Sequence, residues 1–461
     1  MDTKQYIKSV VESTREHIFI RDEDGILIIK PNRVHNLNPM ATKLLKRLYE
    51  LPAEQAHVAI EEISKEFGVP EERVYEDARK VLDTLLDLLK HPFSVSNSVK
   101  MMPFGSHKRD LPVLSEIALT YGCNNNCVFC YASSPERESD VEQMTTEQVK
   151  RILDIIRNDA KIPTVSFTGG EPTLRKDLPE LVRYAKSIDL RVNLISNGVL
   201  LGKGDLAERL VEAGLDSAQI SLESHDSEIH DKVVGIKGAH KNTVAGFKKM
   251  KSMGIHTHIN TTICKDNIDS ITLLPRFAKE ELGLEYQSMN MVIRTGHTYD
   301  NPDEIGYTEV AKVLPDLKAA AEKAGIKLVW YSPMPFCIFN TIAAGIGGTT
   351  CAACDGLLSI APNGDVLPCS SFSDGIGNLL TQSFDQVWWN RQALYFRKKE
   401  FLPPVCVDCE HAKLCQGACP LYWDNVGSFC EIKKSTKLQD LFWNMKRRMI
   451  GKSKPVKGVK A

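Results

Sequence analysis

The sequence has no cysteine before position 123 and no excess of charge of either sign. Its 58 Lys and Arg residues balance 59 Asp and Glu residues, so no overall field attracts nucleic acid or an anionic membrane surface. No run approaches the roughly 20 apolar residues that span a bilayer, and the first residues lack the apolar centre of a signal peptide. These absences predict a cytoplasmic protein with no nucleic-acid partner and no transmembrane segment.

The cysteines themselves are unusual for such a protein. There are 13 in 461 residues, a length that predicts two to four folded domains. A reducing compartment does not sustain structural disulfides, so metal binding is the expected reason for them. Three lie at 123–130 and nine between 337 and 430, whereas Cys264 stands alone and is predicted to be a small buried side chain.

Residues 18–95 have the pattern of a small α+β domain. An alternation of apolar and polar residues with Asp24-Gly25 at its centre predicts a hairpin, and three amphipathic helices follow it. The domain resembles a winged helix in this order of elements. Its 11 basic and 14 acidic residues speak against DNA binding, which requires a basic face.

Residues 112–330 predict an α/β domain with a parallel sheet. Six short β-rich runs, from IALT to YQSMNMVI, are each followed by a helical period. Such a series folds with right-handed crossovers, as a doubly wound sheet or as part of a barrel. In both cases the chemistry is expected at the carboxyl ends of the strands.

Three cysteines follow the first of these strands, at positions 123, 127 and 130. Three thiols on one loop suit an iron-sulfur cluster that leaves one iron open, because a structural zinc site normally has a fourth ligand. A zinc site completed by a distant residue is the alternative.

Polar residues and glycines mark the ends of the following strands. Gly169-Gly170-Glu171-Pro172 follows the second strand, and glycines there allow a ligand close to the backbone. Singly, each of these residues is compatible with a cap or a turn, but together they surround one mouth. The later strands add Ser196, Asn197, Ser221, Glu223 and Asn260.

At this point the sequence resembles the radical S-adenosylmethionine (radical SAM) superfamily. The resemblance rests on C-x3-C-x2-C after the first strand, with Phe129 before the last cysteine, and on the GGEP motif at 169–172. It implies a partial (β/α)6 TIM-like barrel over residues 112–330. It also implies a 4Fe-4S cluster whose free iron chelates SAM, and a flavodoxin- or ferredoxin-type reductant.

The roles of individual residues follow from that resemblance. Cys123, Cys127 and Cys130 would hold the cluster, and one electron from it would cleave SAM to a 5'-deoxyadenosyl radical that abstracts hydrogen from the substrate. The segment 169–171 would receive the SAM amino group, and Glu223 stands where many relatives have Asp. The cofactor-binding set, with the nucleoside contacts at 196–197 and the ribose or carboxylate contacts at 221–223, is Phe129, Gly169, Gly170, Glu171, Pro172, Ser196, Asn197, Ser221, Glu223 and Asn260.

The C-terminal cysteines, at 337–430, are similar to the SPASM extension of radical SAM maturases. The matching pattern is Cys354-x9-Gly364-x4-Cys369, then Cys406-x2-Cys409-x5-Cys415-x3-Cys419, then Cys430. The resemblance implies two auxiliary clusters, one held by Cys406, Cys409, Cys415 and Cys430. The other would take Cys354, Cys369 and Cys419 with either Cys351, which we prefer because it is closer, or Cys337.

This cysteine-rich region has few long periodic segments, so metal bonds are expected to supply much of its folding free energy. A zinc ribbon formed by four of the cysteines at 406–419 is the alternative. Residues 431–461 form a basic tail, with seven Lys and Arg residues and no acid from 446 onward. That tail is predicted to be solvated.

Residues 18–95 also resemble the PqqD-like peptide-recognition domain of pathways for ribosomally made, modified peptides (RiPPs). In that family a leader peptide adds as a strand to the edge of the sheet. The alternative is a structural cap that binds no ligand.

Together these patterns predict a radical SAM oxidoreductase that modifies a peptide or protein carrying a leader. A second hypothesis keeps the radical chemistry and changes the substrate to a small molecule such as a tetrapyrrole. A third is an iron-sulfur electron carrier or sensor. Formylglycine formation on sulfatases is disfavoured, because Ser370 stands where those relatives have a catalytic Asp.

Overall fold

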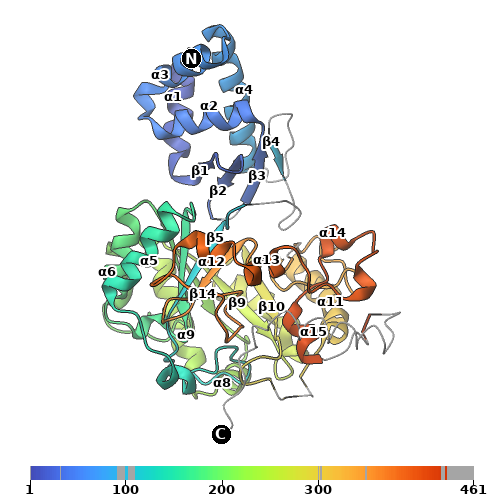
Figure 1. The fold of residues 1–461 in the computed structure, drawn as a ribbon. Helices are drawn as coiled ribbons and strands as arrows, with labels where there is room; N and C mark the ends of the chain where they lie inside the picture. The colour runs from blue at the N-terminus through green and yellow to red at the C-terminus, as the bar shows by residue number, and fades with distance from the viewer. Residues whose placement is uncertain are drawn as a thin grey trace. The chain divides into compact units, whose positions relative to one another are not determined.

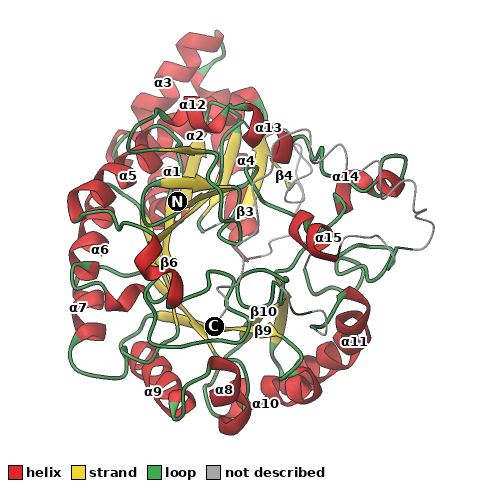
Figure 2. Ribbon diagram, turned by 60° about the horizontal axis from the view of Figure 1, so that its bottom comes forward, coloured by secondary structure: helices red, strands yellow, loops and turns green. Residues whose placement is uncertain are grey.

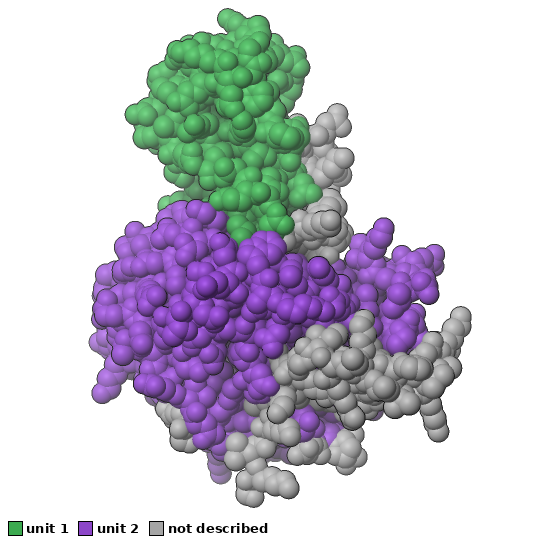
Figure 3. All heavy atoms as spheres, in the orientation of Figure 1, with its two compact units in different colours: residues 1–114 green, residues 115–461 purple. Residues whose placement is uncertain are grey.

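The computed structural model describes residues 2–31, 33–90, 99–101, 110–299, 301, 304–347, 350–426 and 431–432. The chain forms two compact units, residues 1–114 and residues 115–461 (Figure 3). Within the described ranges, no helix has both the length and the apolar character needed to cross a membrane. The basic tail predicted at 431–461 lies outside the described residues, except for its first two positions.

The first unit packs helices on an antiparallel sheet with the strand order β1-β2-β3-β4 (Figure 1). The predicted hairpin turns at Gly25, whose φ of +65° is the left-handed conformation that glycine favours. The elements are α1 (Thr3–Thr14), β1 (Ile18–Arg21), β2 (Ile26–Ile29), β3 (Arg33–Leu37), α2 (Pro39–Glu50), α3 (Ala56–Phe67), α4 (Glu71–Lys90) and β4 (Val99–Met101).

One hydrophobic core holds this unit together. Helix α2 begins at Asn38, whose side chain accepts a hydrogen bond from the N–H of Ala41 at 2.8 Å, with Pro39 in the first turn. The apolar face of α2 then buries Leu44, Leu45 and Leu48 completely, and each such burial contributes about 2 kcal/mol. Helix α1, which lies before the predicted start at residue 18, shares this core.

The second unit contains the predicted parallel sheet. Every neighbouring pair from β5 to β11 is parallel, in the order β11-β10-β9-β8-β7-β6-β5. The six predicted strands are present, and β11 is a seventh that the sequence pattern did not reveal. The strands are β5 (Leu114–Thr120), β6 (Thr164–Gly169), β7 (Arg191–Ser196), β8 (Ser217–Ser221), β9 (His256–Ile263), β10 (Tyr286–Met291) and β11 (Lys327–Trp330).

Helices alternate with these strands and lie along the outer side of the curved sheet (Figure 2). The predicted α/β architecture of partial-barrel type is therefore confirmed. The helices are α5 (Thr146–Asn158), α6 (Leu178–Ser187), α7 (Leu206–Glu212), α8 (Ser227–Val234), α9 (Ala239–Ser252), α10 (Leu274–Glu280) and α11 (Tyr307–Ala324).

The cysteine-rich region continues the same sheet on the other side of β5, in the order β5-β12-β13-β14. Its elements are short, as predicted: β12 (Leu357–Ile360), β13 (Asp365–Leu367), β14 (Gly377–Asn378), α12 (Phe384–Trp388), α13 (Arg391–Arg397), α14 (Ala412–Cys415) and α15 (Pro420–Val426). Because β12 lies beside β5, this region borders the first strand of the barrel.

Candidate functional site

A cavity of about 310 Å³ opens at the carboxyl ends of the parallel strands. This is where the strand-helix pattern placed the chemistry. Nine of the side chains that line it are candidates from the sequence, and two of the candidate glycines also line it. They are Cys123, Cys127, Phe129, Cys130, Gly169, Gly170, Ser196, Asn197, Ser221, Glu223 and Asn260, counting both glycines.

The loop that carries the three cysteines is held by backbone contacts on two sides. The N–H groups of Asn126 and Val128 donate to the carbonyls of Val234 and Val233 at the end of α8, each at 2.9 Å. On the other side, the N–H of His297 donates to the Cys130 carbonyl at 3.0 Å, and its ring Nδ1 donates to the Cys127 carbonyl at 2.8 Å. These contacts hold the loop from both sides.

The environment of the three thiols fits an iron-sulfur cluster. Burial and the neighbouring thiols and carboxylates raise the pKa of Cys127 well above its usual value, and burial raises that of Cys123 to about 12. Buried sulfurs that repel one another in this way require a cationic centre to become thiolates. Backbone N–H groups already point at two of them, from Asn125 to Cys123 Sγ at 3.4 Å and from Ser134 to Cys130 Sγ at 3.3 Å.

A zinc site and an iron-sulfur cluster place their ligands differently. Among the described residues, no three Cys, His, Asp or Glu side chains converge as the ligands of a single metal ion do. A zinc site brings all its ligands within about 2.3 Å of one ion, whereas a 4Fe-4S cluster holds each thiolate on a different iron.

The two glycines at the end of β6, Gly169 within the strand and Gly170 after it, are required by close contact with the chain at the end of β5. A Cβ on Gly169 would lie 2.2 Å from the Thr120 carbonyl oxygen, and one on Gly170 would lie 2.4 Å from the Gly122 carbonyl oxygen. Gly169 also has a φ of +132°. The backbone of this segment therefore lies against the start of the cysteine loop, and both glycines face the cavity.

Glu171 organises the strand ends instead of lining the cavity. Its Oε1 accepts hydrogen bonds from the Thr173 N–H (3.0 Å), the Thr173 hydroxyl (2.5 Å) and the Ser196 hydroxyl (2.8 Å), while Oε2 accepts from the Asn197 N–H (2.7 Å). With these four donors the carboxylate joins the ends of β6 and β7. Gly169 and Gly170, and not this side chain, are therefore the part of the segment that faces the cavity.

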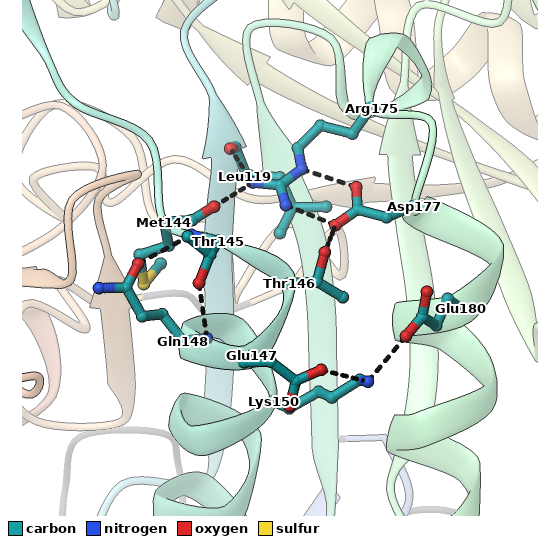
Figure 4. Close-up of polar contacts among 10 residues, drawn as sticks. All are labelled: Leu119, Met144, Thr145, Thr146, Glu147, Gln148, Lys150, Arg175, Asp177 and Glu180. Carbon is teal, nitrogen blue, oxygen red and sulfur yellow. Dashed lines mark hydrogen bonds and ion pairs between the residues drawn. The ribbon is translucent and has the colours of Figure 1, made fainter.

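A second network outside the cavity fixes the same turn (Figure 4). Pro172 is buried in a single helical turn, and Arg175 follows it. The Arg175 guanidinium donates to the Met144 carbonyl at 2.8 Å and to both carboxylate oxygens of Asp177, which also accepts from the Thr146 hydroxyl. Burial works to raise the pKa of Asp177, but the hydrogen bonds from Arg175 and Thr146 lower it.

The remaining polar candidates are held by specific partners. The Asn197 side chain donates to Asn124 Oδ1 at 2.7 Å, and the Asn260 amide donates to Asn290 Oδ1 at 2.7 Å. Glu223 is almost fully buried, and its Oε2 accepts from the Thr262 N–H at 2.8 Å. Burial raises the Glu223 pKa to about 8.

The C-terminal cysteines fall into two electrostatic neighbourhoods. The charge of Cys351 helps to raise the pKa of three other thiols, those of Cys354, Cys369 and Cys419. Cys337 instead belongs to the other set. The charges of Cys409 and Cys415 help to raise its pKa, and its own charge helps to raise the pKa of Cys406. This grouping supports Cys351 for the first auxiliary cluster, and Cys430 lies outside the described residues.

Three residues of the site were not singled out from the sequence. His297 holds the cysteine loop, as described above. His230 accepts a hydrogen bond from the Glu223 N–H at 3.1 Å through its ring Nδ1, and Glu116 lines the cavity from β5. A lone histidine or a charged residue within a strand gives no local signal of such a role.

Comparison with known families gives three matches along the chain. Residues 22–88 match the coenzyme PQQ synthesis protein D (PqqD) family. Residues 117–277 match the radical SAM superfamily, and residues 351–410 match an iron-sulfur cluster-binding domain named SPASM.

Individual relatives point to two kinds of substrate. An AdoMet-dependent heme synthase of Methanosarcina barkeri is 30% identical over 335 residues, which are 69% of this chain and 95% of that protein. A PqqA peptide cyclase of Rhodopseudomonas palustris is 26% identical, over 67% of this chain and 82% of its own. The fold is similar to that of Streptococcus suis SuiB bound to its precursor peptide SuiA, with a TM-score of 0.64, 18% identity, and coverage of 88% of this chain and 95% of SuiB.

Proposed function

This chain belongs to the radical SAM superfamily, and from that membership we propose that it is a maturase that abstracts hydrogen from a ribosomally made peptide carrying a leader. As a member it is an enzyme that uses a 4Fe-4S cluster and SAM, with auxiliary iron-sulfur clusters in its SPASM domain. The electron-carrier hypothesis is therefore set aside. When bound, the cluster and SAM supply an adenosyl radical able to attack an unactivated C–H bond.

The N-terminal unit is the observation that carries this proposal. It matches the PqqD family, has its own hydrophobic core and is a separate compact unit. Such a domain binds a leader through backbone hydrogen bonds at a sheet edge, which leaves the core peptide free to reach the cavity. SuiB, which was solved with a precursor peptide, supports this proposal through its similar fold.

The chain's own residues would prepare the site in three ways. The cysteine loop is held by α8 and His297, so the thiols are in place for the cluster. Glu171 fixes the ends of β6 and β7 around the glycines that face SAM. The walls of the cavity exclude water from the radical, which would otherwise react with it.

A tetrapyrrole substrate is the second candidate, and the 30% identity with a heme synthase favours it. The charge of the cavity does not favour a tetrapyrrole. Porphyrins carry carboxylate side chains, whereas the cavity lining contains the carboxyls of Glu116 and Glu223 and, among the described residues, no Lys, Arg or His. A carboxylate that enters this lining finds no described cation to pair with, and burial already raises the pKa of both glutamates because the site disfavours negative charge.

Anaerobic incubation of the reduced, reconstituted enzyme with SAM decides between the two. The substrates are short peptides encoded near the gene, each with its leader, and an iron porphyrin with carboxylate side chains. We expect 5'-deoxyadenosine and a mass change in one peptide. Turnover of the porphyrin with no change in any peptide would establish the second candidate instead.

A further inference from the structure

The wall of the cavity beside β5 and β12 has no part in the cofactor assignments above. Those assignments use the cysteine loop and the ends of β6, β7, β8 and β9. The remaining wall includes Glu116 on β5 together with Tyr131, Ser370 and Ser371. A substrate that enters beside SAM meets this wall, so its chemistry bears on which substrate fits.

Glu116 is a partly buried residue whose carboxyl group has only neutral hydrogen-bond donors among the described residues. The Ser359 hydroxyl donates to its Oε1 at 2.7 Å, and Ser370 donates through its hydroxyl and its backbone N–H. It makes no ion pair with any residue in the described part of the chain. Burial raises its pKa, as expected for a carboxyl group removed from water without a cation.

Ser370 also fixes the direction in which this carboxyl points. Its hydroxyl is shared with Tyr131, the residue after the last cysteine of the loop. Tyr131, Ser370 and Glu116 therefore form one polar network in the wall of the cavity. The carboxyl is partly accessible, and the cavity that it lines holds no described cation to neutralise it.

We propose that Glu116 binds a cationic side chain of the substrate peptide, a lysine or an arginine close to the residue that is modified. The inference rests on the proposed function, because it assumes a peptide in the cavity. Buried carboxylates in proteins are paired with cations, and here the cation comes from the substrate. The neutral serine donors orient the carboxylate without satisfying its charge.

The variant Glu116→Gln tests this proposal, because the amide keeps the size of the side chain and an oxygen for the serine donors. For a peptide with a lysine or arginine near the modified residue, we expect kcat/KM to fall at least about tenfold, as is usual when one partner of a buried charge pair is removed. For the same peptide with that residue replaced by glutamine, the variant and the wild type should differ little.

Ser359→Ala is the matched control, since it removes a donor to Glu116 and keeps the negative charge. It should retain the preference for the cationic peptide. Iron content and the thermal melting temperature are measured for each variant to show that it is folded and loaded. The two peptides can also be compared on the wild-type enzyme alone, and that part of the test does not depend on whether a variant folds.

Two results would overturn the proposal. Equal losses of the Glu116→Gln variant on cationic and neutral peptides would give Glu116 a purely structural role between β5 and β12. A raised KM for SAM in the absence of peptide would show that Glu116 serves the cofactor. If the wild type modifies no peptide at all, the proposed function itself has failed, which is a different outcome from a wild type that works without this preference.

Discussion

Cys127 and Cys264 show how two cysteines of one chain differ in role. Cys127 is partly exposed, lies beside Cys123 and Cys130 and lines the cavity. Cys264 is buried and follows β9, and its backbone N–H donates to Asn267 Oδ1 at 2.9 Å. Burial raises the pKa of the Cys264 thiol to about 12, as it does for Cys123, so the two sites differ in their neighbouring thiols and not in this pKa.

Replacing Cys127 with alanine should therefore remove the SAM-binding cluster. We expect the iron content to fall by about four atoms per chain, the size of one 4Fe-4S cluster, and 5'-deoxyadenosine formation to stop. Cys264→Ala, the control, should keep both the iron and the activity. Iron analysis and chromatography of the SAM products measure the two effects, and full activity of the Cys127→Ala variant would contradict the site as described.

His230 gives the protein a predictable response to acid. Its ring is fully buried, and burial, together with the charge of His240, lowers its pKa to about 4. Between pH 6.5 and 4 the unfolded chain therefore binds a proton at His230 that the folded protein does not bind. The free energy of unfolding is unaffected above pH 6.5 and falls as the pH drops toward 4, by at most about 1.4 kcal/mol per pH unit from this residue.

Urea unfolding followed by tryptophan fluorescence measures this effect, because all five tryptophans lie in residues 115–461. The loss of stability between pH 7.5 and pH 5 should be smaller for His230→Gln than for the wild type. His57→Gln, which changes an exposed histidine, should behave like the wild type. The same pH dependence in all three proteins would show that His230 titrates normally.

At the scale of elements, the end of β6 depends on its contact with the end of β5. An alanine at Gly169 would place its Cβ 2.2 Å from the Thr120 carbonyl and force the two strand ends apart. We expect Gly169→Ala to lose SAM binding, measured by equilibrium dialysis. Gly204→Ala is the control: it also has a positive φ but no atom within 4 Å, so it should cost only about 1 kcal/mol and bind SAM normally.

Among the short elements of residues 337–430, the burial and grouping of the cysteines predict which one completes the first auxiliary cluster. Cys351 is buried and electrostatically grouped with Cys354, Cys369 and Cys419, whereas Cys337 is exposed. Cys351→Ala should lower the iron content by about four atoms per chain while the SAM cluster remains. Cys337→Ala should leave the first auxiliary cluster intact. Mössbauer spectra of the two variants distinguish these outcomes, and the reverse pattern would assign the place to Cys337.

At the scale of the whole molecule, the repeating pattern of the sequence predicted the helices and strands better than it predicted the contacts between them. Alternating apolar residues and strand-helix repeats gave the hairpin and β5 to β10, because burial on one face imposes a period on the sequence. Strand β11 has only four residues, and no Asp-Gly turn joins it to a second strand as Asp24-Gly25 joins β1 to β2. The roles of Glu171 and His297 depend on partners from distant strands and loops, which no local pattern encodes.

The same division into two units makes a prediction about how a precursor peptide would bind. If the leader binds the N-terminal unit and the core peptide enters the cavity of the other, their linkage raises the effective concentration of the core peptide to about the millimolar range. Free leader added to the full-length enzyme should then raise the KM for the intact precursor and leave kcat unchanged. A leader of scrambled sequence should have no effect, nor should the authentic leader change SAM cleavage in the absence of core peptide.

Because β1 pairs only with β2 and β4 only with β3 among the described strands, the sheet offers the leader two edges at which to bind. A precursor KM that does not respond to free leader would mean that the PqqD-type unit is a structural cap.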